Sequence, residues 1–557
     1  MQWSDDYPAL VFAVIFIFIF LLHLPLLQLP YFWDEAGYYI PAARDILLTA
    51  RFIPHSTISN AHPPLVMAWL ALWWKVVGYA PLVTRTAMLV LAAFSLLGLF
   101  RLAERVSNTR VAIAATLCTA LYPVFFAQSS LAHVDLAAAG LIFWGLSAYV
   151  EGQLLPTALW FSLAALAKET AILAPVAIAG WELIGQFARE TSLHRQWLDY
   201  EAERGDSPAD GGAVRRIASL LFPVLPLALW YLYHYSQTGY VFGNPEFFRY
   251  NVASTLSPTR FLLALAMRLW QISGYLHLWV LTLAMLFAMW MLPPQQDSGF
   301  ERPRISLRAQ MVLYVVVLAY VAAMALIGGA VLARYMLPAV PLVIIVSVST
   351  LWRRLRFWHA AIACIALAFV MAWFWNPPYG FSPEDNLAYR DDIVLHEDAE
   401  RFLEARYPMA RVLTAWPASD ELIRPWLGYT TRPMRVVRIE DFSLDQMLSA
   451  AEFRSNYEVA LVFSTKYEPG PARWDRWRRW TEWKTRFFGF HRDVPPAAAA
   501  QILGGRIVLS ERRKGQWIAV IEMERGEESM DARPVPAAGS FPSVYFPIAL
   551  KTASLMP

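Results

Sequence analysis

Cysteine and charge are both scarce in this sequence. The chain of 557 residues has two cysteines, Cys118 and Cys364, and both fall inside apolar stretches. Their placement excludes a disulfide framework and a cysteine-based metal site. Charged residues make up 16% of the chain, against roughly 25% in soluble domains. The 47 basic and 44 acidic residues nearly cancel, so the overall charge gives no reason to expect nucleic-acid binding.

Apolar residues are abundant instead. Hydrophobic residues make up 57% of the chain, and the mean hydropathy is +0.38. Apolar stretches of about twenty residues, long enough to cross a hydrocarbon core, recur up to residue 375. We therefore predict a polytopic α-helical membrane protein with about eleven transmembrane helices. The candidate spans are residues 9–29, 82–100, 111–128, 136–150, 154–167, 171–187, 219–235, 274–292, 310–330, 336–351 and 357–375.

The first span has no basic region before it and no small-residue cleavage site after it, so we expect it to be a retained anchor. Arginines collect in the connections 101–110, 189–216, 302–308 and 353–356. Because short cytoplasmic loops are rich in Lys and Arg, eleven spans place the N-terminus inside and the C-terminus outside. The apolar segment 64–78 is too short for an ordinary span, and counting it would invert every later loop. We expect it to lie along the outer membrane face.

The composition changes at about residue 376. Several prolines form a linker there, and ordinary charged sequence follows it. Short β-branched runs predict strands at 411–416, 459–463, 506–509 and 517–521, with a helical stretch at 398–406 before them. We therefore expect a transmembrane module over residues 1–376, with a first outer loop at 30–81, and an extracytoplasmic soluble α/β domain over residues 377–557.

Polar residues that interrupt the apolar sequence collect at the predicted outer ends of the spans. Ionisable groups at such depths are costly unless they pair or line a cavity. We therefore expect them to share one site at the membrane surface. They are Asp34, Glu35, His62, Asp135, Lys168, Glu169, Arg334 and Tyr335.

Simpler interpretations remain open for several of these residues. Asp34 is also suited to capping the helix that follows it, and Glu35 to a first-turn charge. Asp135 could cap the helix that begins beside it. Lys168 could pair locally with its neighbour or extend to the headgroups. Against this, cations at headgroup depth suit a lipid phosphate, so Lys168 and Arg334 are candidate phosphate ligands.

In this order, the motifs resemble the GT-C superfamily of integral membrane glycosyltransferases. The resemblance is to the bacterial relatives of protein O-mannosyltransferases and lipid A aminoarabinose transferases. It covers most of the chain and implies an inverting transfer from a polyprenyl-phosphate-linked sugar, with the first-loop acidic residue at the active site. The motifs are Trp33-Asp34-Glu35 with Tyr38, His62-Pro63-Pro64, Asp135, Lys168, and Arg334-Tyr335 with Pro338.

The resemblance leads us to expect a hexosyl- or pentosyltransferase at the outer face of the bacterial cytoplasmic membrane. It would move a sugar from a polyprenyl-phosphate donor to a hydroxyl or phosphate of a glycan, lipid or protein acceptor. We expect Asp34 as the base, with Asp135 and Glu35 as further catalytic carboxylates, and Lys168 and Arg334 on the donor phosphate. The remaining substrate-binding candidates are Tyr38, His62, Glu169 and Tyr335.

The rival function is a polytopic transporter or flippase of a lipid-linked sugar. Transporters usually bind substrate near the midplane and contain repeated halves, whereas these charges cluster at one face and no repeat is evident. A divalent metal is open through the resemblance, but the loop at residues 239–260 has no histidine. We therefore expect no required cofactor and no obligatory protein-bound metal. Residues 473–486 have a tryptophan every third position among basic residues, which favours docking on anionic headgroups or packing on the outer domain.

Overall fold

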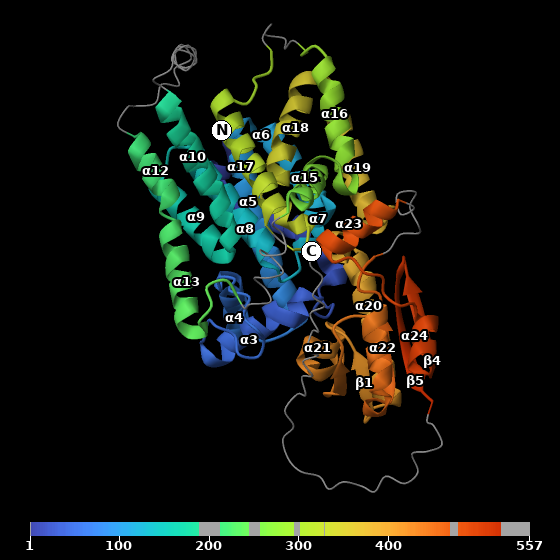
Figure 1. The fold of residues 1–557 in the computed structure, drawn as a ribbon. Coiled ribbons are helices and arrows are strands. Elements are labelled where there is room, and N and C mark those ends of the chain that lie inside the picture. The colour runs from blue at the N-terminus through green and yellow to red at the C-terminus, as the bar shows by residue number, and fades with distance from the viewer. Residues whose placement is uncertain are drawn as a thin grey trace, which may run out of the picture. The chain divides into compact units, whose positions relative to one another are not determined.

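The computed structural model describes residues 2–188, 212–243, 257–294, 301–327, 329–467 and 477–524. The chain divides into two compact units (Figure 1). The larger unit comprises Met1–Val394, Lys466–His491 and Arg513–Gln516, and the smaller unit comprises the rest. The division expected between residues 376 and 377 stays a prediction.

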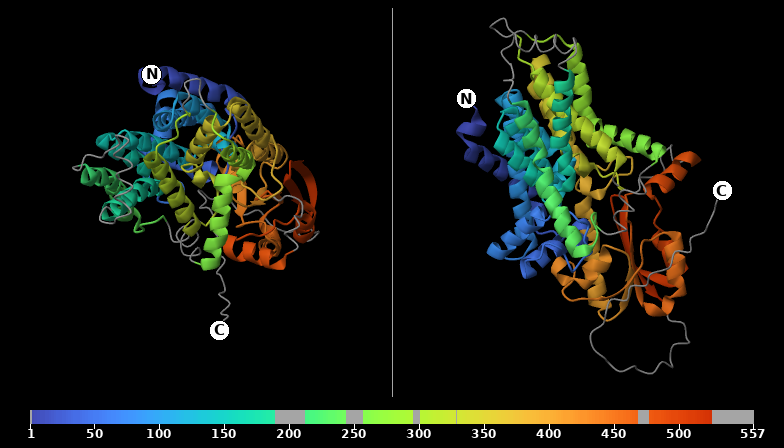
Figure 2. Two further views of the ribbon diagram at one scale, coloured as in Figure 1. Left: turned by 90° about the horizontal axis from the view of Figure 1, so that it is seen from above. Right: turned by 60° about the vertical axis from the view of Figure 1, so that its left-hand side comes forward.

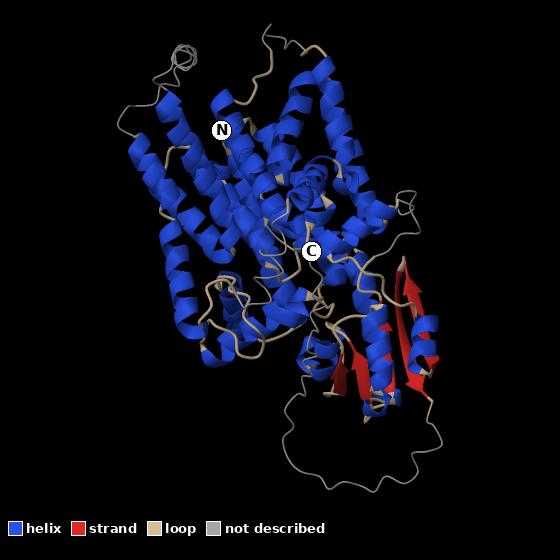
Figure 3. Ribbon diagram, viewed as in Figure 1, coloured by secondary structure: helices blue, strands red, loops and turns tan. Residues whose placement is uncertain are grey.

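The larger unit is helical, whereas the strands form one sheet (Figure 3). The first part of the larger unit contains α1 (Trp3–Asp6), α2 (Pro8–His23), α3 (Ile40–Thr49), α4 (Leu65–Val77), α5 (Pro81–Val106), α6 (Thr109–Leu121), α7 (Pro123–Gln128), α8 (Val134–Val150) and α9 (Leu154–Ala167). It continues with α10 (Leu173–Ala188), α12 (Ala213–Leu221), α13 (Val224–Thr238), α15 (Pro258–Ser273), α16 (Leu278–Trp290), α17 (Leu307–Leu326), α18 (Val340–Arg354), α19 (Trp358–Phe374) and α23 (Arg478–Phe488).

Five segments of the described chain are long and apolar enough to cross a membrane. They are Pro8–Leu26, Pro81–Val106, Ala213–Thr238, Pro258–Trp290 and Leu307–Leu326. Further apolar helices are shorter, so the expected number of about eleven spans stays a prediction, as does the orientation. α4 has 13 residues and is therefore about 20 Å long, shorter than a hydrocarbon core.

Two expected spans differ in the structure. The stretch 111–128 is divided into α6 and α7, because Tyr122 before Pro123 takes an extended backbone with ψ of 126°, as residues before proline prefer. The expected span 274–292 corresponds to α16, which begins at Leu278 and is preceded by α15, a helix that the sequence analysis did not predict. Leu276 and His277 between them have positive φ, and α15 turns away from α16 there (Figure 2).

The core of the larger unit is packed closely around α5, α8 and α9. A Cβ atom at Gly140 of α8 would lie 1.9 Å from Ser95 Oγ of α5, so only glycine allows this approach. The rings of Phe94, Trp144 and Trp160 form a cluster in which each touches the other two, with centroid distances of 4.9, 5.3 and 5.8 Å. This packing fixes the ends of α8 and α9, where two predicted site residues lie.

The smaller unit holds a five-stranded sheet of order β2-β1-β3-β5-β4. β1 pairs with β2 and β3 in parallel, and β3 pairs with β5 antiparallel. The strands are β1 (Arg411–Thr414), β2 (Arg435–Arg438), β3 (Val459–Phe463), β4 (Gly505–Arg513) and β5 (Gln516–Met523). The helices around it are α20 (Ala388–Arg406), which begins in the larger unit, α21 (Ala418–Ile423), α22 (Leu444–Glu452) and α24 (Pro496–Leu503).

The tryptophan-rich stretch is only partly described, because Arg473, Trp474 and Arg476 lie outside the described residues. α23 groups with the larger unit. Its half-buried aromatic residues Trp480, Trp483 and Phe487 share one face, three to four residues apart. Docking of this helix on anionic headgroups stays a prediction.

Candidate active site

The first loop presents two adjacent carboxylates to different surroundings. Asp34 precedes a π-helical turn at Glu35–Tyr39, and its side chain makes no helix-capping hydrogen bond. Asp34 is 31% exposed, whereas Glu35 is completely buried. Adjacent residues on a helix do not share a face. The two carboxylates therefore cannot serve the same substrate atom.

Both carboxylate oxygens of Glu35 accept hydrogen bonds from two donors each. Arg85 of α5 pairs with both of its oxygens, at 2.5 and 2.9 Å. The backbone N–H groups of Phe32 and Ala132 also donate to it, at 2.8 and 2.5 Å. Glu35 thus ties the first loop to α5 and to the segment before α8, and it offers no open oxygen to a substrate.

Arg334 lies at the centre of the predicted site, in the connection between α17 and α18. Its Nη2 donates to Asp34 Oδ2 at 2.5 Å, and its Nη1 donates to Glu384 Oε2 at 2.5 Å. Its Nε lies 3.5 Å from Asp135 Oδ2. These carboxylates hold the pKa of Arg334 well above its ordinary value despite complete burial. The structure therefore brings Asp34, Asp135 and Arg334 together, as the sequence predicted, and adds Glu384.

Lys168 follows α9 and pairs with Asp135 Oδ1 at 2.5 Å. The attraction of Asp135 outweighs burial and raises the pKa of Lys168 above its ordinary value. Asp135 stands in the first turn of α8, where its side chain serves this ion pair and no capping bond is recorded. The Lys168 ammonium also lies 4.1 Å from the ring centroid of Tyr335. Asp135 thus links the two cations predicted to bind phosphate.

Glu169 pairs with His62 instead of serving as a local counter-ion for its neighbour. His62 Nδ1 lies 2.8 Å from Glu169 Oε2. Together with Lys168, this contact lowers the pKa of Glu169 to about 2 against the opposing effect of burial. The His62 ring is stacked with Tyr39 at 6.2 Å and meets Tyr38 edge-on at 6.4 Å. His62, Glu169 and Tyr38 therefore form one wall, which holds the loop before α4 against the end of α9.

Glu384 and Asp385 were missed by the sequence analysis. They stand in the proline-rich linker after α19, yet their residues are 3% and 1% exposed. Burial raises the pKa of Glu384 to about 8 and that of Asp385 to about 7. Asp385 accepts a hydrogen bond from the Tyr275 hydroxyl at 2.5 Å. Two cations, Arg334 and Lys168, thus face the carboxylates of Asp34, Asp135 and Glu384. Burial favours the protonated form of Glu384 near neutral pH.

Arg268 is a second residue that the sequence analysis missed. It is fully buried on α15, and its carbon Cζ lies 5.7 Å from the centroid of the Tyr335 ring. Its Nε and Nη1 donate to the carbonyls of Met324 and Leu332, but its Nη2 has no hydrogen-bond partner among the described residues. An arginine inside an apolar stretch is itself a signal of function. The signal is hard to read from the sequence because the two arginines of α15, Arg260 and Arg268, interrupt its apolar pattern.

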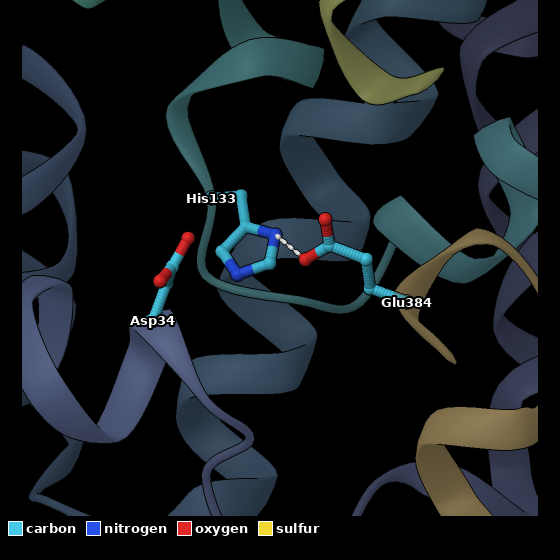
Figure 4. A group of neighbouring side chains, drawn as sticks. All are labelled: Asp34, His133 and Glu384. Atoms are coloured by element: carbon cyan, nitrogen blue, oxygen red, sulfur yellow. Dashed lines mark ion pairs between the residues drawn. The ribbon is translucent and has the colours of Figure 1, made fainter. Parts of the chain in front are cut away.

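One group of possible metal ligands lies around Arg334. Asp34, His133 and Glu384 each have one possible ligand atom within 4.8 Å of the others (Figure 4). His133 Nδ1 lies 3.9 Å from Glu384 Oε2 and 3.1 Å from Arg334 Nη1. Burial and Arg334 lower the pKa of His133 well below its ordinary value. Because the guanidinium already binds both carboxylates, these residues do not fit a metal ion while Arg334 is in place.

The comparisons with known proteins support the predicted family. The family model for dolichyl-phosphate-mannose-protein mannosyltransferases matches residues 61–201, which include His62, His133, Asp135, Lys168 and Glu169. A crystal structure of ArnT from Cupriavidus metallidurans bound to undecaprenyl phosphate matches with a TM-score of 0.53 at 12% identity. This match covers 92% of the present chain and 97% of ArnT. The chain has the GT-C fold.

Two further solved structures are similar to the chain. ArnT in the apo state matches with a TM-score of 0.51 at 12% identity, over 93% of this chain and 98% of that one. The arabinofuranosyltransferase AftD from Mycobacteria matches with a TM-score of 0.44 at 13% identity, over 95% of this chain and 40% of that one. No curated protein sequence matches the chain. The resemblance to GT-C glycosyltransferases is confirmed, and the GT-C fold and the long apolar helices make this a multi-pass membrane protein.

Proposed function

We propose that this GT-C protein is an inverting glycosyltransferase of the bacterial cytoplasmic membrane. It takes a sugar from a polyprenyl-phosphate donor at the outer face and transfers it to a hydroxyl or phosphate of a glycan, lipid or protein. The observation that carries the proposal is the unequal exposure of the carboxylates around Arg334. Asp34 is 31% exposed, whereas Asp135 and Glu384 are 3% and 4% exposed.

Asp34 is the general base in this proposal. The acceptor hydroxyl gives its proton to Asp34 while its oxygen bonds to the anomeric carbon of the sugar. The bond between that carbon and the phosphate oxygen breaks, and the electron pair leaves with the polyprenyl phosphate. Arg334 donates a hydrogen bond to Asp34 at 2.5 Å and so orients the carboxylate.

Lys168, Arg268 and Arg334 stabilise the leaving phosphate. They surround the ring of Tyr335, with charge-to-centroid distances of 4.1, 5.7 and 5.7 Å. Preorganised donors of this kind act on charge as it develops in the transition state. Lys168 and Arg334 are paired with carboxylates before substrate binds, so the donor phosphate has to share them or displace a carboxylate.

We propose positioning roles for the other predicted residues. Asp135 sets the separation of Lys168 and Arg334, and Glu35 fixes the first loop through Arg85. His62, Glu169 and Tyr38 shape the wall of the pocket, because His62 pairs with Glu169 and Tyr38 packs edge-on against the His62 ring. Glu35 is therefore proposed as a buried support rather than as a catalytic carboxylate.

The test begins with cells that carry or lack the gene. Mass spectrometry of their glycans, lipids and proteins should reveal a sugar that disappears with the gene and with Asp34→Asn. Asp445→Asn, a substitution of an exposed carboxylate on α22, is the matched control and should retain the sugar. The purified protein should then form the glycosidic bond from a polyprenyl-phosphate sugar. Movement of the donor across vesicle membranes without any new bond would favour a flippase and contradict the proposal.

A further inference from the structure

A second buried group of polar residues lies in the smaller unit, apart from the residues discussed above. His396 and Glu400 stand one turn apart on α20, and Glu421 stands on α21. Residues four positions apart share a helix face, so both α20 side chains can reach the same neighbour. The side chains of His396, Glu400 and Glu421 are 3%, 0% and 2% exposed.

No lysine or arginine balances the carboxylates of this group in the described part of the chain. His396 Nδ1 lies 2.7 Å from Glu421 Oε2 and 4.0 Å from Glu400 Oε1. Within the described part of the chain, no lysine or arginine pairs with either glutamate, and the carboxyl groups of Glu400 and Glu421 lie beside each other. A buried carboxylate without a partner is costly. Two carboxylates therefore face one imidazole in a closed space that calls for another positive charge.

The geometry suits a small cation between the three side chains. One ligand atom from each lies within 4.8 Å of the others. A tetrahedral zinc ion has ligands at about 2.0–2.1 Å, which sets neighbouring ligand atoms about 3.3 Å apart. The observed distances of 2.7 and 4.0 Å lie on either side of that value. Small side-chain shifts bring His396 Nδ1 to this separation from each glutamate oxygen, and the glutamate oxygens lie within 4.8 Å of each other.

We propose that His396, Glu400 and Glu421 bind a divalent transition-metal ion, zinc being the best match, which ties α20 to α21. The ligand set decides the class of metal. Calcium and magnesium prefer oxygen ligands alone, whereas imidazole together with carboxylates suits zinc. Because the ligands are buried, the ion stabilises the smaller unit and takes no part in sugar transfer.

The rival explanation is a proton. Burial and the neighbouring Glu421 carboxylate raise the pKa of Glu400 well above its ordinary value, so Glu400 holds a proton when no ion is bound. The two explanations differ in whether the site takes up zinc and gives up protons in exchange. A ligating carboxylate must be deprotonated, so metal binding expels protons, whereas a carboxyl pair that shares a proton takes up no metal.

The experiment uses the full chain in lipid nanodiscs. The protein is stripped with a chelator, equilibrated with micromolar zinc, washed, and analysed by inductively coupled plasma mass spectrometry. We expect the wild type to retain about one zinc ion more per chain than Glu400→Gln or Glu421→Gln. Glu397→Gln, which removes a carboxylate paired with Arg401 on the same helix, is the matched control and should bind as the wild type does.

Two results would overturn the proposal. One is a wild-type protein that retains no zinc; the other is a folded Glu400→Gln or Glu421→Gln protein that retains as much as the wild type. If both variants unfold, X-ray absorption at the zinc edge of the wild type decides. One imidazole with oxygen neighbours supports the site, and any other ligand set rejects it.

Discussion

The described residues contain two groups in which one histidine and two carboxylates come within 4.8 Å of each other. In the larger unit, Asp34, His133 and Glu384 surround the guanidinium of Arg334. In the smaller unit, the glutamates of the group around His396 have no arginine or lysine partner among the described residues. The same ligand types thus serve different purposes. In the proposed mechanism, Asp34 beside Arg334 is open for chemistry, whereas the lack of an arginine or lysine in the group around His396 favours a proton or, as proposed, a metal ion.

The comparison is tested most strongly by Asp34→Asn. A general base typically contributes about 10²–10⁴-fold to the rate, so transfer to a hydroxyl acceptor should fall by about that factor. A phosphate acceptor is already ionised and needs no base, so its loss should be smaller. Transfer rates with donor in excess measure the effect, and Asp445→Asn serves as the control. Wild-type rates with a hydroxyl acceptor would remove Asp34 from the mechanism.

Arg334→Ala should make the group of Asp34, His133 and Glu384 resemble the group around His396, which has no arginine partner in the described part of the chain. Loss of a preorganised donor to a developing oxyanion costs about 10²–10³-fold in rate, and we expect a similar loss of transfer. Without the guanidinium, Asp34 and Glu384 lose their shared cation, and a metal ion between them and His133 would replace its charge. The variant should therefore retain more zinc per chain than the wild type. An unchanged zinc content would show that Arg334 is not what prevents metal binding by Asp34, His133 and Glu384.

Glu384→Gln tests the charge balance of the site. The pKa of Glu384 is raised to about 8 by burial, so its carboxyl is protonated and neutral below that pH. The charge of Arg334 is then not neutralised by Glu384 and is available to the donor phosphate. As the pH rises through about 8, ionised Glu384 competes with the donor phosphate for Arg334. The KM for the donor should rise by up to about tenfold between pH 7 and 9. In Glu384→Gln this rise should be lost, and a parallel rise in the variant would contradict the assignment.

The sequence predicted the part of the site that stands out against apolar surroundings. Asp34, Asp135, Lys168 and Arg334 are recognisable because a charge at a span end requires a partner. Their mutual contacts become visible only in the folded structure. The burial of Glu384 does too, because a proline-rich linker normally lies at the surface. The group around Arg334 was therefore predicted without its third carboxylate.

The fold was predicted unevenly for similar reasons. Expected strands overlap β1, β3, β4 and β5, where apolar β-branched residues dominate. β2 was missed because its four residues begin and end with arginine. α15 was missed because Arg260 and Arg268 interrupt its apolar pattern, and both side chains are buried by tertiary packing. Buried charges, which carry much of the function, are the residues that hydropathy describes worst.

The smallest effect on transfer is expected from chelation of the wild type. If zinc lies in the group around His396, the chelator should destabilise the smaller unit and leave the transfer rate unchanged. An ion present at about 100 times its Kd contributes about 2.7 kcal/mol, which corresponds to a fall in Tm of about 10 °C or more for a domain of about 100 residues. Thermal unfolding, followed with and without chelator, measures this shift, and Glu400→Gln should show none. A fall in transfer rate at temperatures where the smaller unit stays folded would mean that a metal serves the chemistry, and it would overturn the division of roles between the two groups.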